Sequence, residues 1–154
     1  KNNNMKYKII EANESYIEQI GKLFDLYRQF YNYNSDIIQS TDYIKNRIIK
    51  KESKIFIALN NEDEAIGFVQ LYETFGSLEL GKIIILYDLY VKNEHRRNKI
   101  GRKLMLASHD YAKKINAKRI QLSTAIDNFI GQSLYESLGY IKDTDFYTYD
   151  FDIK

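Results

Sequence analysis

The chain has 154 residues, of which 44% are hydrophobic and 29% are charged, and its formal net charge is only +2. This balance is typical of one globular domain, and it argues against a protein that coats nucleic acid through a broad basic face. The sequence contains no cysteine, which excludes disulfides, cysteine-ligated zinc and an acyl-cysteine intermediate. No apolar run approaches the roughly 20 residues that span a bilayer, so we expect a cytoplasmic protein without a membrane partner.

In chain order, the first half is predicted to contain one strand, two helices and an antiparallel meander. Residues 1–4 are expected to be a leader or remnant outside the single domain at 5–154. The strand is Tyr7–Ala12, and Asn13 is the expected cap of a helix whose apolar residues recur at helical spacing. A shorter helix is expected to begin at Ser40 or Thr41. Three short strands follow, at residues 54–59, 65–72 and 82–91.

The second half is predicted to alternate helices and strands. A helix begins near Lys99, and residues 119–124 form a strand. A helix over residues 128–138 ends at Gly139, because glycine readily adopts the left-handed conformation that closes a helix. The final strands are expected at residues 140–142 and 146–153, and the last one alternates aromatic and polar side chains. An exposed sheet edge of that kind often pairs with a second copy, so we expect a homodimer.

A cationic turn between the strand at 82–91 and the helix near Lys99 is the most informative segment. Residues 92–103 contain six lysines and arginines against one acid, Glu94. A helix N-terminus binds anions through its free N–H groups and its macrodipole, so we expect a pyrophosphate here. The alternative for such a charge cluster is a solvated helix face, and we assign Lys103, Lys113 and Lys114 to that face. The side chains left for phosphate are those of Arg96, Arg97, Asn98 and Arg102.

Two sequence blocks resemble the GNAT superfamily of acyl-CoA N-acyltransferases, and the resemblance covers nearly the whole chain. Residues 96–101, Arg-Arg-Asn-Lys-Ile-Gly, match the signature R/Q-x-x-G-x-G/A at its first and last positions. Lys99 stands at the middle glycine, where a positive φ angle would strain it and where it also adds a cation. Residues 128–140 look like the second element, N-x-x-A/G-x-x-L-Y-E-x-L-G-Y/F.

The resemblance implies an α/β fold of the α+β type, with a central mixed, mostly antiparallel sheet of six to seven strands and about four flanking helices. The sheet would splay between its fourth and fifth strands at a bulge near residues 89–91, where acetyl-CoA would bond strand backbone. No metal is expected, because His95 and His109 lack the spacing of metal ligands. The expected cofactor-binding residues are Leu89, Tyr90, Val91, Arg96, Arg97, Asn98, Lys99, Ile100, Gly101, Arg102, Asn128 and Tyr135.

Acetyl transfer to an amine needs a base for the amine proton and an acid for the departing thiolate. Asp88 is our first candidate for the base, because it lies in a segment apolar on both faces, where burial raises a carboxyl pKa. Glu73, acting through a water, is the second candidate. Tyr135 matches the family tyrosine near the sulfur and is the expected acid. The alternatives are a structural Asp88, a packing Tyr135 among 14 tyrosines, and an Asn128 that only caps its helix.

The sequence says least about which amine accepts the acetyl group. Acids scattered through the second half favour a cationic small molecule, such as a polyamine or an aminoglycoside, or a basic peptide. We therefore expect an acetyl-CoA-dependent N-acetyltransferase that works by direct attack in a ternary complex. Its rivals are a non-catalytic acyl-CoA-binding or sensing module and, against the near-neutral net charge, a nucleic-acid-binding domain.

Overall fold

The computed structural model describes residues 6–154, which fall into two units. The first unit ends at Leu122 and contains a sheet with α-helices on both faces, and the second runs from Ser123 to Lys154 and contains one helix. No helix in the described part has the length and apolar character needed to cross a bilayer. The expected leader at residues 1–4 lies outside the described residues. The single domain and the cytoplasmic location stay predictions.

The sheet has five strands in the order β1-β2-β3-β4-β5. The strands β2, β3 and β4 form the expected antiparallel meander, β1 pairs antiparallel with β2, and β5 pairs parallel to β4. The mixed α/β class is confirmed, but the expected six to seven strands are wrong, because the described residues form five. The strands are β1 (Lys8–Glu11), β2 (Lys54–Leu59), β3 (Ala65–Gly76), β4 (Gly81–Val91) and β5 (Ile120–Gln121).

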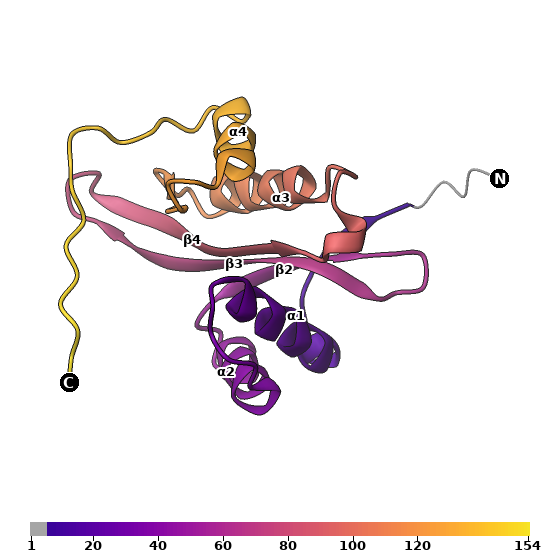
Figure 1. Ribbon diagram of the computed structural model, residues 1–154. Coiled ribbons are helices and arrows are strands. Elements are labelled where there is room, and N and C mark those ends of the chain that lie inside the picture. The colour runs from indigo at the N-terminus through magenta and orange to yellow at the C-terminus, as the bar shows by residue number, and fades with distance from the viewer. Residues whose placement is uncertain (1–5) are drawn as a thin grey trace. The chain divides into compact units, whose positions relative to one another are not determined.

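The helices of the first unit lie on two sides of its sheet (Figure 1). One face is covered by α1 (Ile17–Phe30) and α2 (Ile37–Ile49), and the other by α3 (Ile100–Lys114). Short 3-10 helices, Glu14–Tyr16 and Asn93–His95, precede α1 and α3. Together with the helix of the second unit, the described residues form the four α-helices that the sequence predicts.

The second helix begins earlier than the sequence predicts. α2 starts at Ile37 rather than at residues 40–41, and its cap is Asp36, whose Oδ1 accepts a hydrogen bond from a first-turn amide at 3.0 Å. Ser40 lies inside the helix, and its hydroxyl donates to Oδ1 of Asp25 in α1 at 3.0 Å. The predicted start is wrong because a serine that bonds the neighbouring helix was interpreted as a cap.

The core of the first unit lies between the sheet and the α1–α2 pair. It forms because helical residues three and four apart face alternate residues of the strands. The two helices approach closely at Gly21, where an added Cβ would lie only 2.8 Å from the Thr41 Cα. The buried side chains are those of Ile20, Leu23, Ile44, Ile55, Ile57, Leu59, Ala65 and Phe68.

β4 carries a bulge at Tyr87. Gln70 of β3 lies opposite Asp88, but the next residue of β3, Leu71, lies opposite Leu86. Tyr87 is therefore an extra residue on β4, and it breaks the alternation of side chains along the strand.

The bulge expected near residues 89–91 is wrong in position, because these residues pair with β3 in regular register. The sequence around the true bulge is apolar on both faces, so no change in pattern marks the break in alternation. The fourth and fifth strands do separate, as expected. β5 pairs with β4 only at Ile84 and Ile85, whereas β4 continues to Val91.

In the second unit, α4 (Phe129–Ser137) begins and ends as the sequence predicts. Asn128 caps it, because its Oδ1 accepts a hydrogen bond from the Gly131 amide at 3.1 Å. Gly139 has a φ angle of +90°, the left-handed conformation expected of the residue that ends a helix.

The final strands predicted at residues 140–142 and 146–153 are not formed. The Asp143 Oδ1 accepts hydrogen bonds from the amides of Asp145 and Phe146, at 2.9 and 3.2 Å, and so forms a turn. A strand needs a hydrogen-bonded neighbour. The second unit, all of which is described, contains no other strand to provide one, so the alternating sequence stays extended.

Candidate functional site

The connection from β4 to α3 is a tight turn with two left-handed residues. Arg97 has a φ angle of +66°, and Lys99 has φ and ψ angles of +58° and +23°. Outside glycine this conformation costs about 1–2 kcal/mol per residue, so the surrounding contacts must hold it. Lys99 thus has the positive φ angle that was the condition for strain at the middle position of the signature.

Arg96 and Asn98 support this turn from within. The Arg96 Nε donates to the Val91 carbonyl oxygen at 3.0 Å, and the guanidinium lies 5.7 Å from the centre of the Tyr90 ring. The Asn98 Nδ2 donates to the His95 carbonyl oxygen at 3.0 Å. The structure therefore gives both residues, which were expected to contact phosphate, a bonding role inside the protein.

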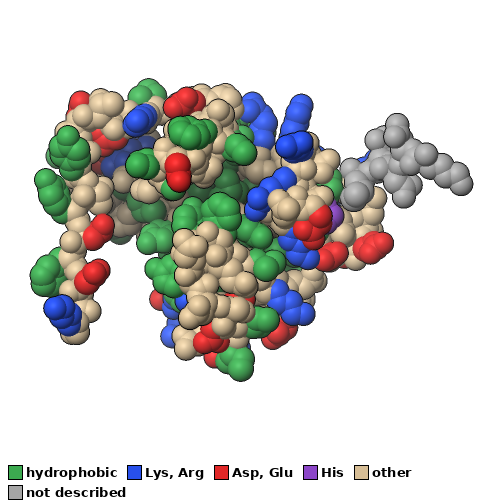
Figure 2. All heavy atoms as spheres, in the orientation of Figure 1, with side chains coloured by type: hydrophobic (Ala, Val, Ile, Leu, Met, Phe, Trp, Pro, Cys, Tyr) green, Lys and Arg blue, Asp and Glu red, His purple; other side chains and the backbone are tan. Residues whose placement is uncertain are grey.

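α3 begins directly after this turn, and no side chain caps it. Its first turn closes on the Lys99 carbonyl oxygen, so the amides of Ile100 and Gly101 have no acceptor within the helix. The side chains of Arg97, Lys99 and Arg102 are exposed here, and Figure 2 shows lysine and arginine side chains gathered over this connection. Helix amides combined with cations fit a phosphate or pyrophosphate group.

The C-terminal part of β4 has one open edge. The Lys92 amide donates to the Ile66 carbonyl oxygen at 2.8 Å, which fixes the alternation of hydrogen-bonded pairs between β3 and β4. By this alternation the main-chain groups of Leu89 and Val91 point away from β3, and those of Tyr90 point toward it. No described strand adjoins that side, because β5 pairs only with the middle of β4. An extended ligand can bond this edge as an additional strand does.

Asp88 lies on β4 beside this edge and is only 3% exposed. The Gln70 Nε2 donates to the Asp88 Oδ2 at 2.7 Å. Burial raises the pKa of Asp88, and the hydrogen bonds from Gln70 and Tyr27 lower it in part. The burial expected from the sequence is confirmed, and it makes this carboxylate a stronger base than an exposed aspartate.

Tyrosines lie around this carboxylate on the face of the sheet that α1 covers. The Tyr27 hydroxyl of α1 donates to the Tyr87 carbonyl oxygen at 3.3 Å, and the Tyr72 and Tyr87 ring centres are 5.8 Å apart. Burial, with the charge of Asp88 as a further cause, raises the pKa of Tyr27, Tyr31 and Tyr72. These phenols therefore stay neutral at neutral pH.

Sequence reasoning missed Gln70 and the tyrosines. Gln70 is fully buried, and its signal was a single amide side chain within the apolar run Gly-Phe-Val-Gln-Leu-Tyr of β3. Tyr27 and Tyr31 recur at the spacing of any core-facing helix, so their pattern alone does not distinguish a site from packing.

Glu73 lies apart from Asp88. The Glu73 Oε1 accepts a hydrogen bond from the Tyr111 hydroxyl of α3 at 3.0 Å, and its Oε2 lies 3.8 Å from the Lys82 Nζ. Burial and the neighbouring Glu73 raise the pKa of Tyr111 to about 12. Glu73 thus faces α3, whereas Asp88 faces α1, so the two candidate bases lie on opposite faces of the sheet.

Comparison with known proteins identifies the family. The sequence pattern of the Acetyltransferase (GNAT) family matches residues 20–140, which include the cationic turn, the start of α3 and Asp88. The chain belongs to this family. The resemblance found in the two sequence blocks is confirmed, and the chain is an N-acetyltransferase.

Related proteins cover nearly the full length of this GNAT acetyltransferase. The Bacillus subtilis (strain 168) protein named uncharacterized N-acetyltransferase YhfO is 41% identical over 141 residues, which are 92% of this chain and 94% of that one. The spermidine N(1)-acetyltransferase of Thermoplasma acidophilum is 27% identical, over 88% of this chain and 91% of its own. The crystal structure of a probable acetyltransferase has a TM-score of 0.89 and 36% identity, over 96% of this chain and 98% of that one.

The family uses acetyl-CoA as its acetyl donor, and the first unit fits that molecule. The uncapped, cationic start of α3 suits its pyrophosphate. The open edge of β4 suits its extended pantetheine arm, which carries amide groups that can bond strand backbone.

Asn128 and Tyr135 belong to the second unit of this GNAT protein. Besides capping α4, Asn128 donates from Nδ2 to the Thr124 Oγ1 at 2.9 Å. The Tyr135 ring centre lies 6.1 Å from that of Tyr140, whose pKa rises to about 12 through burial and the neighbouring Tyr135. The cap is confirmed, and the roles of Asn128 toward the cofactor and of Tyr135 as an acid stay predictions.

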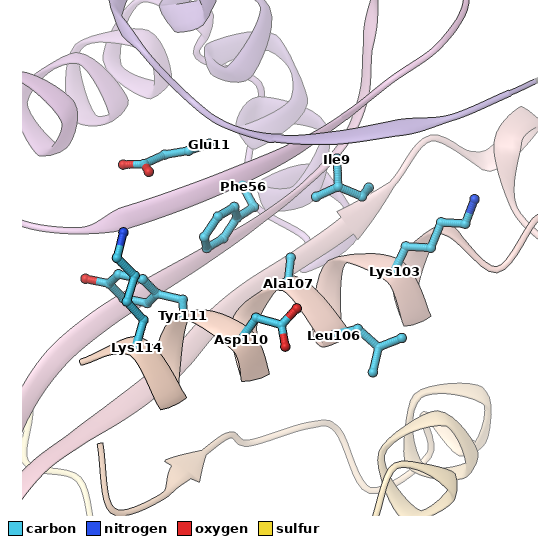
Figure 3. Close-up of a pocket in the computed structure, with 9 residues that line it drawn as sticks. All are labelled: Ile9, Glu11, Phe56, Lys103, Leu106, Ala107, Asp110, Tyr111 and Lys114. Atoms are coloured by element: carbon cyan, nitrogen blue, oxygen red, sulfur yellow. The ribbon is translucent and has the colours of Figure 1, made fainter. Parts of the chain in front are cut away.

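A separate groove of about 550 Å³ lies between α3 and the strands β1 and β2 (Figure 3). Its walls are apolar and its rim carries charges of both signs, and it receives no residue from β4. The lining residues are Ile9, Glu11, Phe56, Lys103, Leu106, Ala107, Asp110, Tyr111 and Lys114. This groove is therefore distinct from the open edge of β4.

Metal ligands do not gather in the described part of the chain. Residues 6–154 contain no group of three His, Cys, Asp or Glu side chains arranged to hold an ion. His95 instead shares a hydrogen bond of 3.2 Å between its Nδ1 and the Tyr7 hydroxyl. Independence from metal stays a prediction.

The substitution Asp88→Asn is expected to stabilise the fold at pH 8 by about 0.5–2 kcal/mol. Burial raises the pKa of Asp88, so the folded protein binds this proton more tightly than the unfolded chain. The stability of the native protein therefore falls as the pH rises from the ordinary aspartate pKa through the raised one. The gain from asparagine should grow over the same interval, as measured by urea unfolding from pH 4.5 to 8. A variant less stable than the native protein at pH 8 would contradict this account.

Proposed function

We propose that this GNAT acetyltransferase transfers an acetyl group from acetyl-CoA to a primary amine of a small cationic molecule or a basic peptide, by direct attack within a ternary complex. The observation that carries the proposal is the order in which three features follow one another along β4. β4 presents the buried Asp88, then an open edge, and then leads into the cationic start of α3.

The cofactor is held mainly by backbone in this proposal. The amides of Ile100 and Gly101, with the cations of Arg97, Lys99 and Arg102, bind the pyrophosphate. The main chain of Leu89 and Val91 bonds the pantetheine arm, and their side chains are free to vary. Arg96, Asn98 and Tyr90 contribute by holding the turn and the strand in place, and Asn128 adds a contact from the second unit.

In the reaction, the amine nitrogen attacks the thioester carbonyl carbon, so that a C–N bond forms and the C–S bond breaks. Asp88 accepts the proton that the amine loses, and the Tyr135 phenol gives a proton to the departing thiolate. The backbone amides on the open edge of β4 receive the charge that develops on the carbonyl oxygen. The reacting groups gain most of their rate from being held next to one another.

The assignment of the base to Asp88 rather than Glu73 follows from their surroundings. Glu73 accepts a hydrogen bond from Tyr111 on the α3 face, and Glu79, another of the scattered acids, binds Arg119. Asp88 is withdrawn from water, and its neighbours are tyrosines, whose ring faces also attract ammonium groups. These features support a cationic amine as the acceptor, and a relative that is named for spermidine is consistent with it.

Arg97→Ala is expected to weaken acetyl-CoA binding about tenfold, the effect of losing one charged contact of about 1.4 kcal/mol. Isothermal titration calorimetry with coenzyme A measures this change. The matched control is Lys114→Ala at the opposite end of α3, which removes the same charge and should leave the affinity unchanged. Equal losses for both variants, or no binding heat for the native protein, would contradict the placement of the pyrophosphate.

Tyr135→Phe is expected to lower kcat about a hundredfold, as loss of a general acid does, and to change the affinity for acetyl-CoA less than threefold. The control is Tyr140→Phe, because the family element accepts phenylalanine at that position. Thiol release from acetyl-CoA, measured with a panel of amines, gives kcat and the KM for acetyl-CoA of each variant. Release by the native protein also separates the enzyme from a non-catalytic acyl-CoA-binding module. An unchanged kcat in Tyr135→Phe would remove this tyrosine from the chemistry.

We also propose that the protein is a homodimer joined through its last segment. Tyr147, Tyr149, Phe151 and Ile153 share one side of the alternation, are 88–90% exposed and find no cover within the second unit. Figure 2 shows apolar and acidic side chains alternating along this segment. Aromatic residues bury about 150–250 Å² each, so the six aromatic side chains of two such segments bury about 900–1,500 Å². The two Ile153 side chains add to this, which brings the area to about the lower part of the 1,200–2,000 Å² of a standard interface.

Tyr149→Asp should convert the dimer to a monomer at 10–50 µM protein, because it places a charge on the apolar side of the segment. Thr148→Asp is the control, since it adds the same charge to the adjacent residue on the opposite side. Sedimentation velocity distinguishes the two states. A native protein that sediments as a monomer at these concentrations would end the proposal.

A further inference from the structure

Three side chains from three successive segments form a hydrogen-bonded relay that ends at Asp88. Ser53, just before β2, donates from its hydroxyl to the Gln70 Oε1 of β3 at 2.8 Å. The Gln70 Nε2 in turn donates to the Asp88 Oδ2 of β4 at 2.7 Å. Gln70 is 0% exposed and Asp88 is 3% exposed, so water does not compete for the second bond.

The chemistry of these groups fixes the direction of the relay. An ionised carboxylate only accepts hydrogen bonds, so only the NH₂ end of the Gln70 amide can face Asp88. The Gln70 Oε1 then lies toward Ser53, whose hydroxyl donates to it. A flipped amide would place an oxygen against the carboxylate and an NH₂ group against the Ser53 oxygen, and would lose the bond to the charged group.

The Tyr87 bulge brings the two buried groups together. In a regular ladder that keeps Leu71 opposite Leu86, the residue opposite Gln70 would be Tyr87. The extra residue shifts the register by one and puts Asp88 there instead. The local irregularity of β4 and the buried amide of β3 are therefore parts of one arrangement, although they are far apart in the sequence.

We propose that Gln70, held in orientation by Ser53, positions the Asp88 carboxylate as the base of acetyl transfer. This inference rests on the proposed function. Gln70 is a positioning residue, since it acts through Asp88 and not on the substrate. It engages Oδ2 of the carboxylate, to which Tyr27 of α1 also donates a hydrogen bond. It also stabilises the ionised form, and so offsets part of the rise in the Asp88 pKa that burial causes.

The titratable groups around Asp88 come from four elements. α1 contributes Tyr27 and Tyr31, β3 contributes Tyr72 and β4 contributes Tyr87. Burial raises the pKa of the first three, so that they stay neutral below pH 9. From α2, Tyr43 bonds the Tyr72 hydroxyl at 2.7 Å, and the Arg47 guanidinium lies over the Tyr43 ring at 4.5 Å and keeps its charge throughout. Asp88 is thus the carboxyl group of this cluster, and burial raises its pKa.

The test measures the Asp88 pKa and the rate separately, in the full-length protein. Gln70→Leu removes the donor, so the carboxyl pKa should rise by one to two units, the value of a hydrogen bond to a buried charge. A ¹³C NMR titration of the Asp88 carboxyl shows this shift whether or not the protein turns over. With an acceptor amine found in the thiol-release panel, the acid limb of kcat/KM should move to higher pH by the same amount. kcat at pH 7 should fall about tenfold while the KM for acetyl-CoA stays unchanged.

Two further variants keep the test informative. Ser53→Ala leaves the buried core intact and should shift both pKa readings in the same direction by a smaller amount, even where Gln70→Leu does not fold. Val69→Ala removes volume from the adjacent buried residue of β3, whose side chain points to the opposite face, and should lower stability without moving either pKa.

The outcomes separate the relay from the proposed function. Parallel shifts of the NMR and kinetic pKa in Gln70→Leu or Ser53→Ala support the inference. An Asp88 pKa that does not move in either variant overturns the relay. An NMR shift without a kinetic shift overturns its role in catalysis, because Asp88 is then not the base. An absence of acetyl transfer by the native protein overturns the proposed function, while the NMR titration still reports on the relay.

Discussion

A carboxylate held almost out of water within a β-sheet is the constraint on which the rest of the first unit depends. Such a charge is unfavourable unless donors reach it, and a strand of isoleucine, leucine and tyrosine offers few. The protein meets this requirement with one amide from the neighbouring strand and with the Tyr27 phenol, both on the face that α1 covers. The extra residue at Tyr87 is the backbone adjustment that makes the arrangement fit.

The two ends of the site have opposite electrostatic character. The turn before α3 attracts anions through amides and exposed cations, whereas Asp88 and the aromatic rings attract cations. Asp88 and Val91 are three residue steps apart on an extended strand, which is about 10 Å at 3.3 Å per step. In the proposed function, the donor places its phosphates at one end and its reactive carbonyl at the other, which requires a long, extended molecule that lies along the open edge of β4.

The sequence was sufficient for elements whose pattern is local. The meander strands, the cap at Asn128 and the glycine that ends α4 follow from residue chemistry within a few positions. The left-handed conformation of Lys99 was suggested only by the glycine that the family signature carries there. The start of α2 was misjudged because Ser40 bonds a residue on another helix. The bulge at Tyr87 was misplaced because a strand apolar on both faces carries no mark of a broken alternation. Gln70 was overlooked because its importance depends on which residue lies opposite, and register is a property of two strands. The last strands were expected from alternation alone, but a strand also needs a partner.

The inward bonding of Arg96 and Asn98 has a kinetic consequence. Because these side chains brace the turn against β4 and the 3-10 helix, its shape exists before a ligand arrives, and little loop entropy is lost on association. With the pyrophosphate placed as proposed, capture of the cofactor is governed by diffusion toward the exposed charges of Arg97, Lys99 and Arg102. Ionic strength should therefore act on how fast the two molecules meet, through screening, and leave the geometry of the docked phosphates untouched.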